Sequence, residues 1–289
     1  MASTAHPSAP LDLAARAPAS AAEARFAFGD NWWRFLRLVD ERRVAIAEQS
    51  LREALGVDDL AGRRFLDVGS GSGLFSLAAR RLGATVHSFD YDPQSVACAE
   101  ALRQRFRPAD PGWTVEQGSA LDRAYLARLG AFDVVYSWGV LHHTGAMWDA
   151  LANVETCVAP GGTLFIALYD DQGAKSRFWW WVKRIYVALP RPLRAPWAVA
   201  VAIPFELRML AKQTLAGELR RWLESWTQYE SVRGMSRWHD LLDWMGGFPF
   251  EVAKPADVER FYEARGYRTR LVHPTGGAGC VEYVFERKG

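Results

Sequence analysis

The sequence predicts an α/β fold with a doubly wound, seven-stranded sheet that is parallel except for an antiparallel hairpin at its C-terminal end. Short apolar runs alternate with single stretches of helical spacing from Arg64 onward, which is typical of such sheets. The first apolar run leads into a glycine cluster at 69–73. The last two runs are joined by 273–279, which is too short for a crossover helix, so these two strands must pair antiparallel. A chain of 289 residues has room for one such domain and an insertion.

The N-terminal part of the chain precedes the first strand. Residues 1–20 are rich in Ala, Ser and Pro and lack the apolar stretch of a signal peptide, so they predict a disordered tail. Residues 21–58 predict N-terminal helices. Helical spacing begins near Ala21, is interrupted near 29–31 and continues to about Leu55.

Residues 59–170 predict the core of the sheet. Apolar runs predict five buried strands, at 64–68, 85–89, 113–116, 132–137 and 162–169. Stretches of helical spacing separate them, at 74–82, 93–106, 121–129 and 146–158. Near the C-terminus, residues 255–289 predict a final helix at 258–265 and the strands 267–272 and 280–287, which complete the sheet.

Residues 171–254 form a predicted helical insertion before the last two strands. Eight of the 13 tryptophans lie between residues 172 and 245, and this stretch has 12 Lys and Arg against 6 Asp and Glu. Its longest charge-free run, 195–205, has 11 residues, well short of the roughly 20 that cross a bilayer, so no transmembrane helix is expected. Three functions stay open for the insertion: a lid over the active site, an oligomer interface such as a homodimer, or a basic surface in peripheral contact with anionic membrane.

The overall composition narrows the classes of function. The formal net charge is only +2, so the overall charge does not indicate nucleic acid as a partner. Cys98, Cys157 and Cys280 are far apart and form no CxxC motif, so neither a disulfide framework nor a metal site is expected. Reduced thiols are typical of the cytoplasm, which is the expected location.

The turn after the first strand, GSGSG at 69–73, predicts a ligand site. Glycines let the backbone approach a ligand closely and adopt positive φ without steric cost. Asp90 ends the second strand 21 residues after Gly69, where a carboxylate can accept hydrogen bonds from both hydroxyls of a ribose. Asp67, at the end of the first strand, can face a cationic amino group. Position 74 is Leu, where the dinucleotide fingerprint requires a small residue, so a nicotinamide-dependent oxidoreductase is disfavoured.

Four motifs together resemble those of class I S-adenosylmethionine-dependent methyltransferases. They read LDVGSGSG at 66–73, FDYDP at 89–93, FDVVYSWGVLHH at 132–143 and APGGTLFI at 159–166. The set is similar to the small-molecule group that includes the ubiquinone-biosynthesis O-methyltransferases. The resemblance implies a Rossmann-like fold, with residues 59–170 as its cofactor-binding core, and S-adenosyl-L-methionine as the cofactor.

The resemblance also implies roles for single residues along that cofactor. The methionine portion is expected to contact the first turn, the ribose the end of the second strand, the adenine the residues after the second and third strands, and the sulfonium region the end of the fourth strand. In that order the expected contacts are Asp67, Gly69, Ser70 and Gly71; Asp90; Tyr91, Ser119 and Ala120; and Ser137 and Trp138.

An aromatic cluster ahead of the first strand predicts a covering element. Phe28, Trp32 and Trp33 lie there, and we expect this segment to close over the cofactor or the acceptor, with Trp32 among the cofactor contacts. The alternative is a helix packed on the outer surface of the sheet.

Methyl transfer to a hydroxyl also needs a general base, and His is the usual choice near neutral pH. His142 and His143 follow the fourth strand and are candidates, although residues at this turn can instead cap the next helix or pack over the cofactor. Tyr169 follows the fifth strand together with Asp170 and is a candidate acceptor contact.

The insertion contributes a second set of candidates at 236–240. Here the predicted catalytic residues are His239 and Asp240, and the predicted acceptor contacts are Arg237 and Trp238. The alternative is a helix capped by Ser236 and otherwise solvated.

We therefore predict an enzyme that transfers a methyl group from S-adenosylmethionine to a hydroxyl, or an amine, of a small-molecule acceptor. The alternative is a methyltransferase that acts on a peptide or on nucleic acid. The loop at 137–140 lacks the [D/N]PP[Y/F] motif of amino-directed DNA enzymes, and no cysteine follows a proline as cytosine-C5 enzymes require. A non-catalytic cofactor-binding protein is a further rival, because intact binding residues do not establish catalysis.

Overall fold

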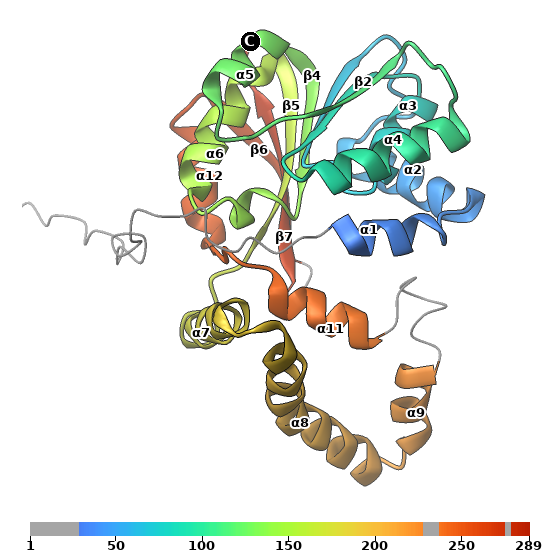
Figure 1. Cartoon of the computed structure of the whole chain (residues 1–289). Helices are drawn as coiled ribbons and strands as arrows, with labels where there is room; N and C mark the ends of the chain where they lie inside the picture. The colour runs from blue at the N-terminus through green and yellow to red at the C-terminus, as the bar shows by residue number, and fades with distance from the viewer. Residues whose placement is uncertain (1–28, 228–236, 275–278) are drawn as a thin grey trace, which may run out of the picture.

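A computed structural model gives the fold and describes residues 29–227, 237–274 and 279–289 (Figure 1). Seven strands form one sheet in the order β3-β2-β1-β4-β5-β7-β6, and among these strands β7 is the one that runs antiparallel to its neighbours. The predicted fold class is confirmed. The strands are β1 (Arg64–Val68), β2 (Thr85–Asp90), β3 (Trp113–Gln117), β4 (Phe132–Trp138), β5 (Val158–Tyr169), β6 (Tyr267–Pro274) and β7 (Cys280–Arg287).

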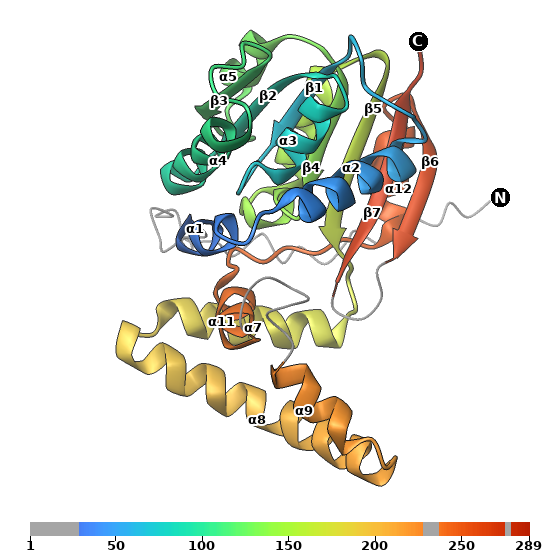
Figure 2. The ribbon, with the colours of Figure 1, turned by 90° about the vertical axis from the view of Figure 1, so that its right-hand side faces the viewer.

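Helices cover both faces of the sheet and enclose one apolar core on each (Figure 2). The first face is covered by α2 (Glu41–Leu55), α3 (Leu74–Arg81) and α4 (Pro93–Phe106). The second face is covered by α5 (Arg123–Leu129), α6 (Met147–Val154) and α12 (Pro255–Glu263). Two short 3₁₀ turns, η1 (Leu141–His143) and η2 (Glu155–Cys157), flank α6. The strand ends are thereby held at fixed positions between two packed layers.

Aspartates begin three of these helices at the positions where the chain leaves a strand or a turn. The side chains of Asp40, Asp92 and Asp122 accept hydrogen bonds from backbone N–H groups in the first turns of α2, α4 and α5. An aspartate at this position satisfies a donor that the helix itself leaves unpaired.

The N-terminal helices differ from the expected break. α1 (Gly29–Leu36) is helical at 29–31, where an interruption was predicted, so that prediction is wrong. The chain turns instead between α1 and α2, where Leu38 N–H donates to Phe35 O and Asp40 caps α2. The cap residue, and not the glycine at 29, therefore sets the boundary. The predicted tail, 1–20, and Phe28 lie outside the described residues.

The insertion lies beyond the carboxyl ends of the parallel strands (Figure 1). It contains α7 (Ala174–Ala188), α8 (Arg191–Leu215), α9 (Leu219–Thr227) and α11 (Arg237–Gly246). A small core of its own joins Val182, Tyr186, Ala198 and Met245. The chain leaves the sheet at Asp170 and returns at Ala253, and these two residues pair as a β-bridge. The two ends of the insertion are therefore neighbours.

Candidate active site

The largest hollow near the glycine turn is a cavity of about 540 Å³ at the carboxyl ends of β1, β2 and β4. Eleven of the residues predicted for the site line this cavity. They come from α1, the ends of β1, β2 and β4, the turns after β1, β2 and β3, and η1, and are Trp32, Asp67, Gly69, Ser70, Gly71, Asp90, Tyr91, Ser119, Ala120, Trp138 and His143. The parallel strand order brings these turns to one edge of the sheet.

The glycine turn is shaped by two close approaches. Gly69 has φ 77° and Gly71 has φ 53°, a backbone region that favours glycine. A Cβ atom on Gly69 would lie 2.3 Å from a methyl group of Val140, and one on Gly71 would lie 2.8 Å from the ring of Trp32. The absence of side chains thus allows α1 and the turn after β4 to pack against the loop.

Asp90 is anchored at the end of β2. Its Oδ2 accepts a hydrogen bond from Gly71 N–H and its Oδ1 one from Asp92 N–H, both at 2.9 Å. Burial raises the pKa of Asp90 to about 6, against the effect of these hydrogen bonds. The two bonds use two of the roughly four acceptor positions of a carboxylate, so the side chain can still accept from a diol.

Asp67 lies beside polar groups that the protein does not satisfy. Its Oδ2 accepts from Ser76 Oγ at 2.5 Å, and burial raises its pKa to about 7. Tyr136 is its register partner on β4. The Tyr136 hydroxyl and Ser70 Oγ both line the cavity, are buried, and have no hydrogen-bond partner among the described residues. Buried polar atoms are rarely left so, and the arrangement suits a ligand with polar groups at this end.

The end of β4 places its two predicted residues differently. Ser137 is fully buried and donates to Val68 O at 2.9 Å, so it braces β1 against β4 and does not line the cavity. Trp138 lines the cavity, and its Nε1 donates to Glu282 Oε1 of β7 at 2.8 Å.

The two adjacent histidines of η1 also have different surroundings. His143 lines the cavity, and its Nδ1 lies 2.6 Å from Pro249 O. A carbonyl only accepts, so Nδ1 carries the proton and Nε2 carries the lone pair in the neutral ring. Burial lowers the pKa of His143 to about 4. His142 is fully buried, lies outside the cavity lining, and packs on Tyr169 with ring centroids 4.0 Å apart.

Tyr169 lies away from the cavity as well. Its ring packs on His142 and on Phe250, the latter with a centroid distance of 5.2 Å, and it is absent from the cavity lining. In the described structure Tyr169 supports η1 by packing against the ring of His142.

Comparison with known proteins identifies the architecture. The family model described as a methyltransferase domain matches residues 38–245, which is 208 of 289 residues. The chain belongs to this methyltransferase family. The resemblance to S-adenosylmethionine-dependent methyltransferases seen in its motifs is confirmed.

Two curated relatives of the methyltransferase share its central part. A tRNA U34 carboxymethyltransferase of Methylococcus capsulatus is 36% identical over 119 residues, which cover 41% of this chain and 36% of that protein. A ubiquinone biosynthesis O-methyltransferase of Parvibaculum lavamentivorans is 30% identical over 169 residues, which cover 54% of this chain and 65% of that protein. The chain thus spans less than two thirds of the length of either relative.

A solved structure supports the fold of the methyltransferase. The magnesium protoporphyrin IX methyltransferase of Synechocystis, with bound SAH, matches 90% of this chain and 94% of its own length with a TM-score of 0.50. At 16% identity the likeness concerns the fold alone. In the described part of the methyltransferase, no helix combines the length and apolarity needed to cross a membrane.

The residues that line the cavity match the chemical groups of S-adenosylmethionine. Asp90 offers acceptors for a ribose diol, and the half-buried ring of Trp32 covers Gly71. Asp67, Ser70 and Tyr136 offer a carboxyl group and two hydroxyls to an amino-acid group. A carboxyl that is buried and only partly compensated gains most from an added cation.

Three residues in or beside the methyltransferase site are notable among those that sequence reasoning missed. Tyr136 was hidden in an apolar strand, although its register with Asp67 could have indicated it. Phe248 lines the cavity from the segment after α11. Lys183 of α7 is fully buried behind the cavity, where its ammonium donates to Trp244 O and lies 4.3 Å from the centroid of the Trp244 ring.

Lys183 and His143 both lie close to Gly247. A Cβ atom on Gly247 would lie 3.1 Å from Cε1 of His143 and 3.5 Å from Nζ of Lys183. Burial lowers the pKa of Lys183 to about 7, and the lysine in turn disfavours protonation of His143. The insertion therefore influences the charge of a residue in the cavity wall.

The remaining predicted residues lie on α11. Its backbone is helical from Arg237 to Gly246, but the side chains of the four predicted residues lie outside the described part of the structure. These residues are Arg237, Trp238, His239 and Asp240, and their roles stay predictions.

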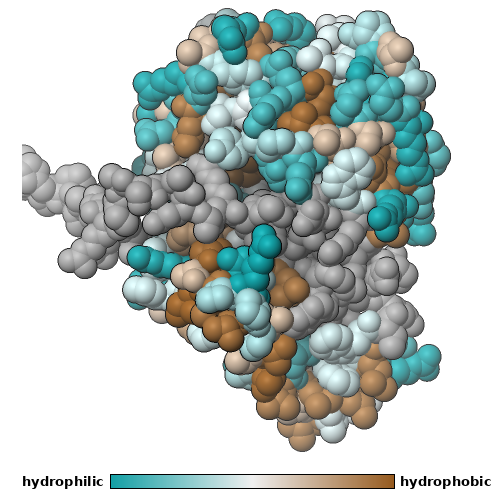
Figure 3. All heavy atoms as spheres, viewed as in Figure 1, coloured by the Kyte–Doolittle hydropathy of each residue, from teal (hydrophilic) through white to brown (hydrophobic). Residues whose placement is uncertain are grey.

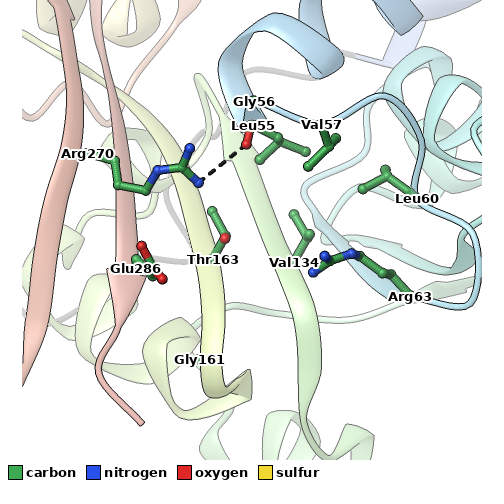
Figure 4. Close-up of a pocket in the computed structure, with 10 residues that line it drawn as sticks. All are labelled: Leu55, Gly56, Val57, Leu60, Arg63, Val134, Gly161, Thr163, Arg270 and Glu286. Atoms are coloured by element: carbon green, nitrogen blue, oxygen red, sulfur yellow. Dashed lines mark hydrogen bonds between the residues drawn. The ribbon is translucent and has the colours of Figure 1, made fainter.

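A second, smaller hollow of about 180 Å³ lies near the opposite ends of the parallel strands (Figure 4). Arg63, Val134, Thr163 and Arg270 are among its lining residues, and Arg270 Nη1 donates to Leu55 O at 3.3 Å. No residue predicted for the site lines it, so the predicted chemistry belongs to the larger cavity.

Proposed function

We propose that this methyltransferase acts on a hydroxyl, or an amine, of a small-molecule acceptor and that His143 is its general base. One observation carries the proposal. His143 lines the same cavity as the glycine turn and Asp90, and its Nδ1–H donates to Pro249 O, which leaves the Nε2 lone pair as the basic site.

The proposed roles follow the order of the strands. Asp90 at the end of β2 holds the ribose, while Tyr91 and the Ser119–Ala120 pair flank the adenine. Asp67, Ser70 and Tyr136 hold the amino-acid end beside β1 and β4. Trp138, at the end of β4, and His143, in η1, would lie beside the methyl-transfer end of the cofactor.

The bound cofactor supplies a methyl group already activated by its sulfonium sulfur. The protein has to hold the acceptor oxygen or nitrogen, the methyl carbon and the sulfur in line and to exclude water. Trp32 and Phe248 supply apolar walls for this purpose. Nε2 of His143 would accept the proton that a hydroxyl acceptor loses when it is methylated.

The weak basicity of His143 favours one class of acceptor. The pKa of His143 is lowered to about 4, so the ring is neutral, and ready to accept a proton, through the neutral pH range. A base of this strength works best on an acceptor whose proton is comparatively acidic, since proton transfer becomes more favourable as the two pKa values approach each other. A phenolic hydroxyl is therefore our first choice of acceptor.

Turnover with defined acceptors tests the substrate class. The purified chain is incubated with S-adenosylmethionine and, in separate reactions, with phenols, amines, a peptide mixture and bulk tRNA, and S-adenosylhomocysteine is measured. We expect turnover with a phenol or an amine. The ubiquinone-biosynthesis relative supports this choice, whereas the tRNA carboxymethyltransferase relative makes tRNA the necessary comparison. Turnover with tRNA alone would contradict the proposal.

The adjacent histidines provide a matched pair for the base. His143→Gln should lower kcat by about 10²–10⁴-fold, typical for the loss of a general base, with little change in S-adenosylmethionine affinity. His142→Phe, which changes the buried ring outside the cavity lining, should keep kcat within about tenfold of the wild type if the fold is retained. Equal losses in the two variants would mean that the turn is only structural.

A further inference from the structure

One face of α8 is apolar and exposed along the whole helix. Its residues recur every three or four positions, so they share one side of the helix. We call this set the apolar stripe; it consists of Leu193, Pro196, Ala200, Ile203, Leu207, Ala211 and Leu215. The exposed fractions of Leu193, Ile203, Leu207 and Leu215 are 51%, 48%, 60% and 90%.

The apolar stripe is not needed for the core of the insertion. The other side of α8 supplies Trp197, Ala198 and Val201 to the cluster with α7 and α11. α9 adds a second exposed apolar set, Leu219, Leu223 and Trp226, at helical spacing. Figure 3 shows hydrophobic side chains gathered at the lower end of the molecule, over α8 and α9. A monomeric protein rarely exposes so continuous an apolar surface without a partner for it.

Basic residues lie along one edge of the stripe. Arg208 and Lys212 directly follow Leu207 and Ala211, are exposed, and form no ion pair with any residue in the described ranges. The single carboxylate of α8, Glu206, accepts a hydrogen bond from Trp222 Nε1 of α9 at 3.3 Å. The edge of the stripe is therefore positive.

We propose that the apolar stripe of α8, with the exposed side chains of α9, docks the enzyme on the surface of an anionic phospholipid bilayer. An apolar face edged by Lys and Arg is the composition of helices that lie in the membrane interface. The helix of 25 residues is about 37 Å long at 1.5 Å per residue and would lie along the surface. The docking does not depend on which acceptor is methylated.

The charges favour a bilayer over a second copy of the chain. Two antiparallel stripes related by twofold symmetry would place their two basic edges on the same side of the contact, and the single carboxylate of α8, Glu206, already accepts a hydrogen bond from Trp222. Lipid phosphates supply the negative charges, and the acyl region accepts the apolar side chains.

Flotation with vesicles tests the proposal. The full chain is mixed with vesicles of phosphatidylcholine alone or with about 30% phosphatidylglycerol, and the bound fraction is measured at about 0.1 and 0.5 M salt. We expect binding to the anionic vesicles only, and weaker binding at the higher salt concentration, because salt screens the basic residues.

Three variants separate the contributions. Ile203→Ser with Leu207→Ser should lower the partition coefficient by about tenfold or more, since two apolar side chains leave the interface. Arg208→Glu with Lys212→Glu should lower it by at least about tenfold on anionic vesicles. Ile46→Ser is the matched control, because Ile46 of α2 is 59% exposed, as Leu207 is, but lies outside the insertion. It should bind like the wild type, and circular dichroism establishes that each variant is folded.

Two results would overturn the proposal. One is a wild type that fails to bind anionic vesicles at low salt. The other is equal binding by all folded variants. A dimeric mass in solution that the Ile203→Ser, Leu207→Ser variant converts to a monomer, without vesicle binding by the wild type, would assign the stripe to a homodimer instead.

Discussion

In the sheet domain, large aromatic residues such as Phe65, Phe89 and Trp113 are almost completely buried, whereas in the insertion Trp181, Phe205 and Trp226 are about half exposed. Both regions are rich in apolar residues, but only the sheet domain encloses them in two continuous cores. The difference indicates where each region acts. The sheet domain works on a ligand inside a cavity, and the insertion leaves large apolar side chains exposed for contacts outside the chain.

The largest effect on cofactor binding is expected inside the cavity, at Asp90. Asp90→Ala should weaken S-adenosylmethionine binding about 10- to 150-fold, because it removes charge-assisted hydrogen bonds worth roughly 1.5–3 kcal/mol. Calorimetry measures the affinity. Asp122→Ala is the control, since it removes an aspartate that caps α5 and lies outside the cavity lining. Wild-type affinity in Asp90→Ala would remove this residue from the ribose site.

A smaller effect is expected where the insertion meets the sheet domain, at Lys183. Burial lowers its pKa from 10.5 to about 7, so between these pH values the unfolded chain binds a proton that the folded chain does not. The free energy of unfolding should therefore rise with pH in this window, by up to about 1.4 kcal/mol per pH unit. Lys183→Met cannot titrate and should lack this contribution.

Urea unfolding at about pH 7.5 and 9.5 measures the difference. Between these two pH values the free energy of unfolding of the wild type should rise by roughly 2–3 kcal/mol more than that of Lys183→Met. Lys175→Met is the control, because Lys175 is exposed on the same helix, and it should follow the wild-type pH profile. Parallel profiles for the wild type and Lys183→Met would mean that the lysine is not buried in solution.

The smallest effect is expected at the edge of the cavity, at Trp32. Trp32→Ala should reduce S-adenosylmethionine affinity by about five- to tenfold, which corresponds to the loss of roughly 1–1.4 kcal/mol of apolar contact. Trp33→Ala is the matched control, since Trp33 is exposed and absent from the cavity lining. A Trp32→Ala variant that loses only thermal stability would make α1 a structural helix.

The sheet and the cofactor side of the cavity could be predicted because local patterns determine them. Buried parallel strands are continuous apolar runs, and the turns that follow them must meet at one edge. Asp67, Gly69 and Asp90 could therefore be placed together before their distances were known. The N-terminal break was misplaced because a single cap at Asp40, and not glycine content, decides where α2 begins.

The acceptor side could not be predicted in the same way, because tertiary packing determines it. His142 and His143 are adjacent in sequence, but the 3₁₀ turn directs only His143 into the cavity wall. Phe248 and Lys183 come from segments whose position relative to the sheet is fixed by contacts distant in sequence. Apolar content predicted helices in the insertion, but not which side of each helix would face outward.

The bridge between Asp170 and Ala253 has a consequence for how such enzymes diversify. Asp171 N–H donates to Ala253 O and Ala253 N–H donates to Tyr169 O, both at 3.1 Å, so the polypeptide enters and leaves the insertion at a single point. An insertion whose two ends lie so close together can be lengthened, shortened or exchanged by recombination without altering the strand order. The last few residues before Ala253 are the exception, because the Pro249 carbonyl fixes the tautomer of His143. Evolution could thus change the surface that the insertion presents while keeping the proposed proton transfer to His143 intact.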